Sequence, residues 1–303
     1  MGKGLLDIES LARSDAEAIL ERAKFFQPPP GEPYQRHQIL QGRSIVNLFF
    51  EASTRTRTSF EIAGRRLGAE IISITASGSS VSKGESLVDT LNTLGAMRPD
   101  AIVMRHSASG APHFLSRYLP IPIVNAGDGT HEHPTQALLD ALTILDRRKT
   151  LEGLRVAIIG DIAHSRVARS NIFLLSKFGA QVVLCGPASL LPREIAHIAP
   201  GIELATDMEK AIRGVDVIMM LRVQLERQHE AAFPANEYFR FFGLRIEHME
   251  LAKPDVIVMH PGPMNRGQEI SSEVADSQRS AILNQVGNGI AVRMAVLERV
   301  FTQ

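Results

Sequence analysis

The strongest chemical signal in the sequence is the run Ser53-Thr54-Arg55-Thr56-Arg57. It directly follows residues 44–50, an apolar stretch that predicts a buried strand. Hydroxyls and backbone N–H groups at the start of a helix, reinforced by a guanidinium, suit a phosphate or a carboxylate. The alternative is that Ser53 or Thr54 only caps the helix while the arginines are hydrated.

Polar groups also follow the other predicted strands. Residues 101–104 lead to Arg105, and residues 121–124 lead to a loop that ends at His133 and Gln136. Ligands of open parallel sheets bind beyond the carboxyl ends of the strands. Cations and hydrogen-bond donors without a nucleophile suit the holding of anionic reactants and the stabilisation of an oxyanion, which indicates group transfer. The strands of the second half are followed by a similar set: Asp161, Arg166, Arg222, Gln224, Gly262 and Pro263.

The segment His131-Glu132-His133 raises the question of a metal site. It lacks the helical His-Glu-x-x-His spacing, and Pro134 predicts a loop that enters a helix, so we expect no metal. At a helix N-terminus a neutral His133 can donate to a developing oxyanion. A histidine that only caps or packs is the alternative.

Three other features argue against common cofactors and nucleophiles. The serine-rich loop 78–85 carries Lys83 but fails the phosphate-loop pattern, so on its own Lys83 is expected to be hydrated. Gly160-Asp161 lacks the glycines of a dinucleotide turn. Cys185 lies in an apolar strand, where packing is more common than catalysis. We therefore expect no cofactor.

The composition excludes several classes of protein. The 303 residues include 33 Lys+Arg and 33 Asp+Glu, and this zero net charge gives no reason to expect nucleic acid or an anionic membrane as partner. A single cysteine is typical of a reducing compartment, and we expect a cytoplasmic protein. No apolar run reaches the length of a membrane span, and the first residues show no signal-peptide core.

Short β-branched runs alternate with helical patterns along the whole chain, which predicts an α/β fold of two doubly wound domains, each with a mainly parallel sheet flanked by helices. A polar break near residue 150 divides the chain into domains 1–149 and 150–286, and a last helix at about 287–303 is expected to pack back on the first domain. Ser14 and Glu17 predict a capping box for the first helix. Further strands are expected at 71–74, 155–159, 181–185, 215–221 and 256–259, and helices at 59–67, 85–97, 112–118 and 134–148.

Taken together and in this order, four segments make a specific pattern: residues 53–57, residues 79–85, His133-Pro134-Thr135-Gln136 and Arg222-Val223-Gln224. The chain resembles the catalytic chains of the aspartate carbamoyltransferase family over nearly its full length. The resemblance implies transfer of the carbamoyl group of carbamoyl phosphate to the amino group of L-aspartate, in pyrimidine biosynthesis. It also implies a homotrimer in which neighbouring subunits share active sites.

The resemblance also implies a role for each site residue. Gln136 and the backbone at Gly262 and Pro263 should bind the carbamoyl nitrogen. His133 and Thr56 should polarise the carbonyl. The phosphate should be held by Ser53, Thr54, Arg55, Thr56 and Arg105, with Ser79 and Lys83 arriving from a neighbouring subunit; Ser80 is the alternative to Ser79. Aspartate should be bound by Lys83, Arg166, Arg222 and Gln224, and the groups expected to act in catalysis are Arg55, Thr56, Lys83, Arg105, His133 and Gln136.

The nearest rival is the sister enzyme that carbamoylates ornithine. Its extra ammonium group would be repelled by Arg222, and the segment His260-Pro261-Gly262-Pro263 lacks the cysteine typical of that enzyme. A non-catalytic binder of phosphorylated metabolites and a metal-dependent hydrolase that uses His131 and His133 are more distant alternatives. The sequence leaves open whether the trimer joins regulatory or dihydroorotase-like chains.

Overall fold

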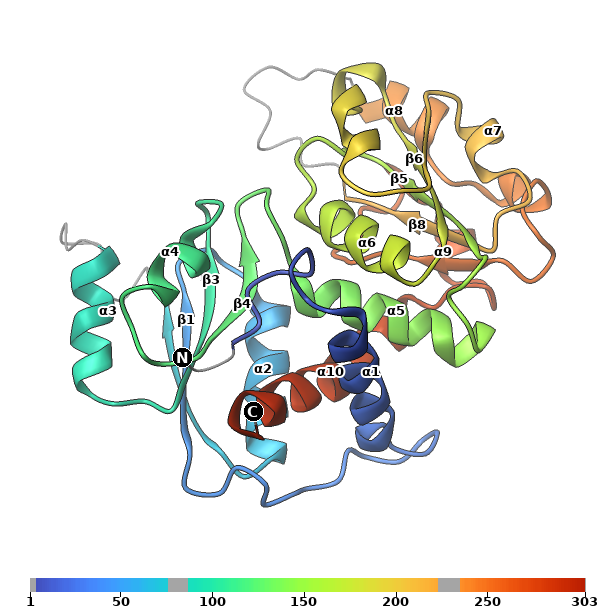
Figure 1. Cartoon of the computed structure of the whole chain (residues 1–303). Helices are drawn as coiled ribbons and strands as arrows, with labels where there is room; N and C mark the ends of the chain where they lie inside the picture. Colours follow the sequence, from blue (N-terminus) through green and yellow to red (C-terminus); the bar gives the residue numbers. More distant parts are fainter. Residues whose placement is uncertain (1–3, 76–86, 223–234, 303) are drawn as a thin grey trace. The chain divides into compact units, whose positions relative to one another are not determined.

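The computed structural model describes residues 4–75, 87–222 and 235–302, and strands alternate with helices through all three segments (Figure 1). The strands are β1 (Ser44–Phe49), β2 (Glu70–Thr75), β3 (Ala101–His106), β4 (Ile123–Asp128), β5 (Arg155–Ile159), β6 (Gln181–Cys185), β7 (Ile202–Ala205), β8 (Val217–Met220) and β9 (Ile257–Met259). The α-helices are α1 (Arg13–Phe26), α2 (Thr54–Arg66), α3 (Leu87–Ala96), α4 (Ala111–Ser116), α5 (Pro134–Arg148), α6 (Arg166–Lys177), α7 (Met208–Ile212), α8 (Ala235–Phe242), α9 (Ser272–Ala275) and α10 (Ile282–Thr302). Short 3₁₀ helices include η3 (Ala188–Leu190), η4 (Arg193–His197) and η6 (Ile246–Glu250).

The chain forms two compact units. Unit 1 comprises Met1–Leu142 and Gly287–Gln303, and unit 2 comprises Thr143–Val286. The division falls inside α5, whereas the sequence places a polar break just after this helix. Every strand pair in the two named sheets is parallel, and helices flank both sheets. The predicted fold class is therefore confirmed.

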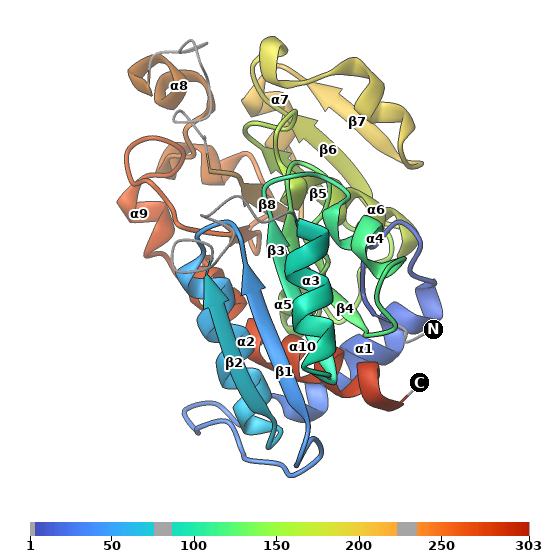
Figure 2. The same cartoon turned by 90° about the vertical axis from the view of Figure 1, so that its left-hand side faces the viewer.

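The sheet of unit 1 has the strand order β2-β1-β3-β4. One face packs on α3 and α4, where Leu91 and Leu115 meet Leu48 and Met104 in a buried apolar cluster. The opposite face carries α1, α2 and α10, as Figures 1 and 2 show. Arg22 of α1 forms an ion pair with Glu298 of α10, with an N–O distance of 2.6 Å. The last helix, from Gly287 onward, thus forms part of this first unit.

The sheet of unit 2 has the order β7-β6-β5-β8-β9. Ile159 and Ile218 point to one face, where they join a cluster formed with α7, α8 and α9. Residues that alternate with these, such as Ile158, face the other side, where α6 contacts β6. Strands buried on both faces read as continuous apolar runs, which is why the sequence shows β5, β6 and β8 so clearly.

The structure corrects three local predictions. The helix expected from residue 59 begins at Thr54. The prediction placed its start too late, because the first turn is polar and shows no apolar periodicity. The first helix begins at Arg13, with Ala12 as its N-cap, so Ser14 does not form the expected capping box. Glu17, the expected partner of Ser14, instead accepts a hydrogen bond from Arg13 at 2.8 Å. Strand β7 was not predicted, because its four residues are only partly buried and include Glu203, so they form no continuous apolar run.

The N-terminal segment is held to unit 1 by buried polar contacts. The Leu5 N–H donates to the Ile123 carbonyl, and the Ile8 N–H donates to Glu132 Oε2 at 2.8 Å. His113 Nε2 lies 2.5 Å from Asp7 Oδ2. Burial alone would raise the pKa of Asp7, but hydrogen bonds from His113 and Ser10 outweigh it and lower the pKa from 3.8 to about 2. The ionised carboxylate therefore stabilises the folded chain.

Replacing Asp7 by asparagine is expected to lower the free energy of unfolding by roughly 2 kcal/mol at pH 6. Since the folded-state pKa of Asp7 is lower than its ordinary value, this stabilisation is complete above about pH 4 and is lost as the pH falls toward 2. Urea unfolding of the wild-type and Asp7→Asn chains at pH 6, 4 and 3 checks this. A difference that stays constant over this range would contradict it.

Candidate functional site

The chemical groups of unit 1 gather at the carboxyl edge of its sheet. Strands β1, β3 and β4 are neighbours and parallel, so the segments that follow them emerge at the same edge; Figure 2 shows β1 and β3 in this sheet. The Phe50 N–H donates to the Arg105 carbonyl at 2.9 Å, and Arg105 Nη1 donates to the Ala126 carbonyl at 3.2 Å. These contacts tie the ends of the three strands together.

The first turn of α2 has the form of an anion site. Ser53 stands at the N-cap in an extended conformation, yet among the described residues its side chain makes no capping hydrogen bond. The reading in which Ser53 only caps the helix is therefore not supported. The N–H groups of the first turn point out of the helix end, Thr56 is buried and Arg55 is exposed. Arg57 instead turns to Glu61 along the helix, at 3.6 Å.

Arg105 lies at the end of β3 and is largely buried. Its Nη2 is 3.2 Å from Glu51 Oε1, and its Nη1 donates to Ala126. Two anchors on one planar guanidinium fix the direction in which the remaining N–H groups point. The group is well suited to an anion at this edge of the sheet.

His133 and Gln136 open α5 as the sequence predicted. The His133 carbonyl accepts hydrogen bonds from the N–H groups of Gln136 and Ala137, which places the histidine at the helix start. His133 is 4% exposed and Gln136 8% exposed. Gln136 Nε2 donates to Asp140 Oδ1, one turn further along, at 2.9 Å. The two side chains are thus held near the end of β4.

In unit 2, Arg166 and Arg222 follow neighbouring strands. Arg166 is the first residue of α6 after β5, it is buried, and Ser165 caps the helix through its hydroxyl. Arg222 follows β8, which pairs with β5. The carboxyl ends of these two strands form the point where the strand order reverses, the usual place for a ligand. Three further predicted site residues lie outside the described residues: Ser79, Lys83 and Gln224.

The loop at Gly262 and Pro263 is built around His260. The Gly262 N–H donates to His260 Nδ1 at 2.8 Å, so His260 Nε2 carries the hydrogen that faces Glu269 Oε1 at 3.2 Å. Gly262 has φ = 63°, a conformation that glycine adopts without strain, and the peptide bond to Pro263 is cis. The backbone of this loop is therefore presented in a defined shape after β9.

Comparisons with known proteins identify the family and agree with the fold. A family model described as Aspartate/ornithine carbamoyltransferase, carbamoyl-P binding domain, matches residues 3–146, and the Asp/Orn binding domain model of the same family matches residues 152–300. A crystal structure of aspartate transcarbamoylase from Trypanosoma cruzi in complex with N-(phosphonacetyl)-L-aspartic acid is 34% identical, with a TM-score of 0.88 over 98% of this chain and 95% of that one. Ornithine carbamoyltransferase from Pyrococcus furiosus is 31% identical, with a TM-score of 0.86 over 98% and 96%.

The curated relatives separate these two possibilities. The aspartate carbamoyltransferase catalytic subunit of Solibacter usitatus is 76% identical over 300 residues, which is 99% of both chains. The chain belongs to the aspartate carbamoyltransferase family. Membership in this family, with the fold and the strand-end groups described above, makes the chain a carbamoyltransferase.

His131 and Cys185, which the sequence analysis considered as a metal ligand and a nucleophile, have other environments in this aspartate carbamoyltransferase fold. His131 Nδ1 lies 3.1 Å from Asp128 Oδ2, and its ring packs edge-on against His113. Within residues 4–75, 87–222 and 235–302 no group of three or more His, Cys, Asp or Glu side chains is arranged to hold a metal ion. Burial raises the pKa of the Cys185 thiol to about 12, so the thiol stays protonated and serves packing.

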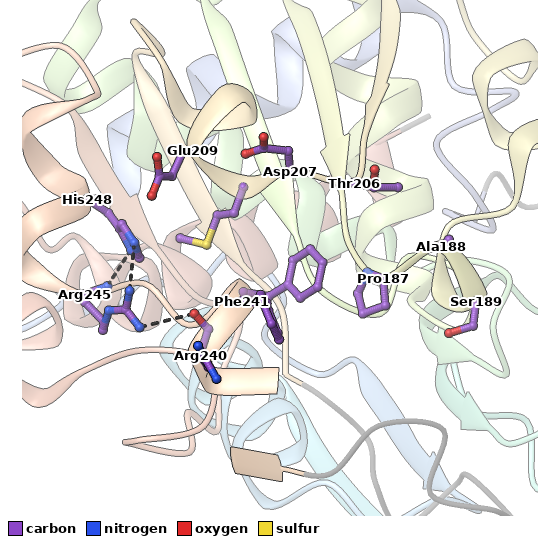
Figure 3. A pocket seen from close by; sticks show the side chains of 12 residues that line it. Pro187, Ala188, Ser189, Thr206, Asp207, Glu209, Arg240, Phe241, Arg245 and His248 are labelled. Atoms are coloured by element: carbon purple, nitrogen blue, oxygen red, sulfur yellow. Dashed lines mark hydrogen bonds between the residues drawn. The ribbon is translucent and has the colours of Figure 1, made fainter. Parts of the chain in front are cut away.

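A cavity of about 690 Å³ lies elsewhere in unit 2 (Figure 3). Segments after β6 and β7, together with α8 and η6, form its wall, and none of the predicted site residues that the structure describes is part of it. Arg245 in this wall already contacts Glu247 at 2.6 Å and donates to the Arg240 carbonyl. We assign this cavity no part in carbamoyl transfer.

The structure adds residues that sequence analysis missed. Glu51 holds Arg105, Asp140 holds Gln136, and His260 shapes the loop at Gly262. Arg293 of α10 is buried and donates to Ser59 Oγ of α2 at 2.8 Å. Asp140 follows Gln136 at i+4 on one helix, a spacing that signals contact. Arg293 has no local signal for this contact, because its side-chain partner Ser59 lies on another helix.

No helix in the part of the chain that the structure describes is long and apolar enough to cross a membrane.

Proposed function

We propose that the chain transfers the carbamoyl group of carbamoyl phosphate to the amino group of L-aspartate, giving N-carbamoyl-L-aspartate and phosphate in pyrimidine biosynthesis. The observation that carries this proposal is the joining of the α2 N-terminus, Arg105 and His133 at one edge of the unit 1 sheet. Anion-binding groups and a polarising donor meet there, as an acyl phosphate requires.

Unit 1 is the carbamoyl phosphate domain in this proposal. Ser53, Thr54, Arg55 and Thr56 hold the phosphate with Arg105, which also reaches the carbonyl oxygen. His133 and Thr56 polarise the carbonyl. The oxygen of the Gln136 amide and the backbone at Gly262 and Pro263 accept hydrogen bonds from the carbamoyl NH₂.

Unit 2 is the aspartate domain. Arg166 binds one carboxylate of the substrate, and Arg222 with Gln224 binds the other. Arginine suits both places because its planar fork of N–H donors matches a carboxylate. Ser79 and Lys83 complete the site from a neighbouring subunit, so the active unit is a homotrimer.

The reaction needs positioning more than it needs a protein base. The neutral amine of aspartate attacks the carbonyl carbon, a C–N bond forms, and the carbonyl electrons move to an oxyanion surrounded by Thr56, Arg105 and His133. Collapse of this intermediate breaks the bond to the phosphate oxygen. The departing phosphate takes the proton that the amine loses, which accounts for the reaction without a dedicated carboxylate or histidine base.

We further infer that the enzyme works in the cytoplasm, without a cofactor or metal, and without nucleic acid or membrane as partner. The single cysteine and the zero net charge support this inference. A larger assembly with regulatory or dihydroorotase-like chains is compatible with the homotrimer.

Product analysis tests the proposal. The purified full chain, given carbamoyl phosphate and aspartate, is expected to release phosphate and carbamoyl-aspartate in equal amounts, with the same rate in the presence of a chelator. Loss of activity on chelation would favour a metal-dependent reaction. Affinity for carbamoyl phosphate without any product from the assembled trimer would favour a binding protein.

A further inference from the structure

Asp140 sets the orientation of the Gln136 amide. A glutamine amide has a donor end and an acceptor end of nearly the same shape, so its contacts decide which end faces a ligand. Gln136 Nε2 lies 2.9 Å from Asp140 Oδ1. An ionised carboxylate only accepts hydrogen bonds, so this contact fixes the NH₂ end of Gln136 toward Asp140. The amide oxygen is left to face away from Asp140.

Asp140 requires a positive partner to remain ionised, because it is fully buried. Arg293 of α10 is in position to supply this charge. Its Nη1 donates to Ser59 Oγ at 2.8 Å and to the Gly289 carbonyl at 3.1 Å, and its guanidinium lies 5.1 Å from the centre of the Phe60 ring. Three contacts therefore fix the side chain.

The charge of Arg293 is influenced by Asp140 and by the two arginines assigned to the phosphate. Burial lowers the pKa of Arg293 to about 10, the negative charge of Asp140 opposes this, and the positive charges of Arg105 and Arg55 add to it. Arg293 thus remains a cation at neutral pH. Its charge is attracted by Asp140 and repelled by the two arginines assigned to the phosphate.

We propose that Asp140 and Arg293 are positioning residues that hold the Gln136 amide oxygen toward the substrate, and thereby select a carbamoyl group over an acyl group that lacks N–H donors. This inference rests on the proposed function. The relevant competitor is acetyl phosphate, in which a methyl group of similar size replaces the NH₂. A glutamine free to turn would present its own NH₂ to the substrate NH₂, and the two donors would repel each other.

The Asp140→Asn chain tests the proposal in the assembled enzyme. The asparagine side chain has one acceptor oxygen in place of two, and the positive charge of Arg293 attracts this oxygen. The NH₂ of the asparagine then faces Gln136, and the Gln136 amide turns so that its oxygen accepts from that NH₂. We expect the KM for carbamoyl phosphate to rise about tenfold, the effect of one hydrogen bond, while the inhibition constant of acetyl phosphate changes less than about twofold. The ratio of the KM for carbamoyl phosphate to the inhibition constant of acetyl phosphate therefore rises. Arg293→Gln is expected to raise this ratio as well.

Controls separate positioning from damage to the fold. Asp7→Asn removes another buried carboxylate of unit 1, and it should lower the urea midpoint but leave the ratio unchanged. Gln136→Ala should by itself raise the ratio of the KM for carbamoyl phosphate to the inhibition constant of acetyl phosphate, and adding Asp140→Asn to it should change nothing more. Equal weakening of both ligands in Asp140→Asn, or an unchanged ratio in Asp140→Asn and in Arg293→Gln, would overturn the positioning role. An unchanged ratio in Gln136→Ala would instead overturn the assignment of Gln136 in the proposed function.

Discussion

Replacing Arg105 by alanine is expected to lower kcat by about a thousandfold, the upper range for loss of one donor to a developing oxyanion. The arginine is assigned to both the phosphate and the carbonyl oxygen, and Glu51 and Ala126 hold it in place. Its loss would also remove the ion pair between Arg105 and Glu51. Arg105→Lys should recover little, since an ammonium group lacks the planar fork. Steady-state kinetics with both substrates varied measures these effects.

Arg43 provides a matched control for this prediction. It forms an ion pair with Asp100 at the amino ends of β1 and β3, the edge of the sheet opposite the site, with an N–O distance of 2.8 Å. Arg43→Ala is expected to keep kcat within about twofold, because exposed ion pairs contribute little to stability. An Arg105→Ala enzyme with kcat within tenfold of the wild type would show that the β3 end does not contact the reacting groups.

Mixing two inactive chains is expected to restore activity. Arg55→Ala and Lys83→Ala chains each spoil every site of their own trimers. If each site combines Arg55 of one subunit with Lys83 of the next, a trimer that contains both variants has one site with both residues intact. Random exchange puts both chains in about three of four trimers, so the mixture should reach about a quarter of wild-type activity.

The double variant controls this experiment. Mixing Arg55→Ala with a chain that carries both substitutions should restore nothing, because no pairing then supplies Lys83 and Arg55 to one site. Subunit exchange is followed with a charge-tagged chain on native gels. Exchange without recovery in the first mixture would contradict shared active sites.

Much of the site could be predicted because parallel strands deliver their last residues to one edge. Arg105 and His133 follow continuous apolar runs, so their positions follow from the strand pattern alone. The start of α2 at Thr54 could not be predicted in the same way, since its first turn, Thr54-Arg55-Thr56-Arg57, is polar and shows no apolar periodicity.

Residues that hold the site residues in place, such as Arg293, could not be predicted from the sequence for a different reason. Arg293 lies in the last helix and donates to Ser59 of the second, a contact that exists only after the chain has folded. Its sequence neighbours give a buried helix face, on which an arginine is unexpected. A charged residue in such a pattern therefore indicates that an opposite charge is buried nearby, although the sequence does not say which one.

Acceptor choice tests the central claim most directly. The full chain is given labelled carbamoyl phosphate with equal concentrations of aspartate and ornithine in one mixture, and the two carbamoylated products are separated and counted. The account predicts carbamoyl-aspartate as essentially the sole product, with the preference lost in an Arg222→Ala chain. Carbamoyl-ornithine as the main product would contradict the assignment of Arg166 and Arg222 to a dicarboxylate, and with it the function proposed for this protein.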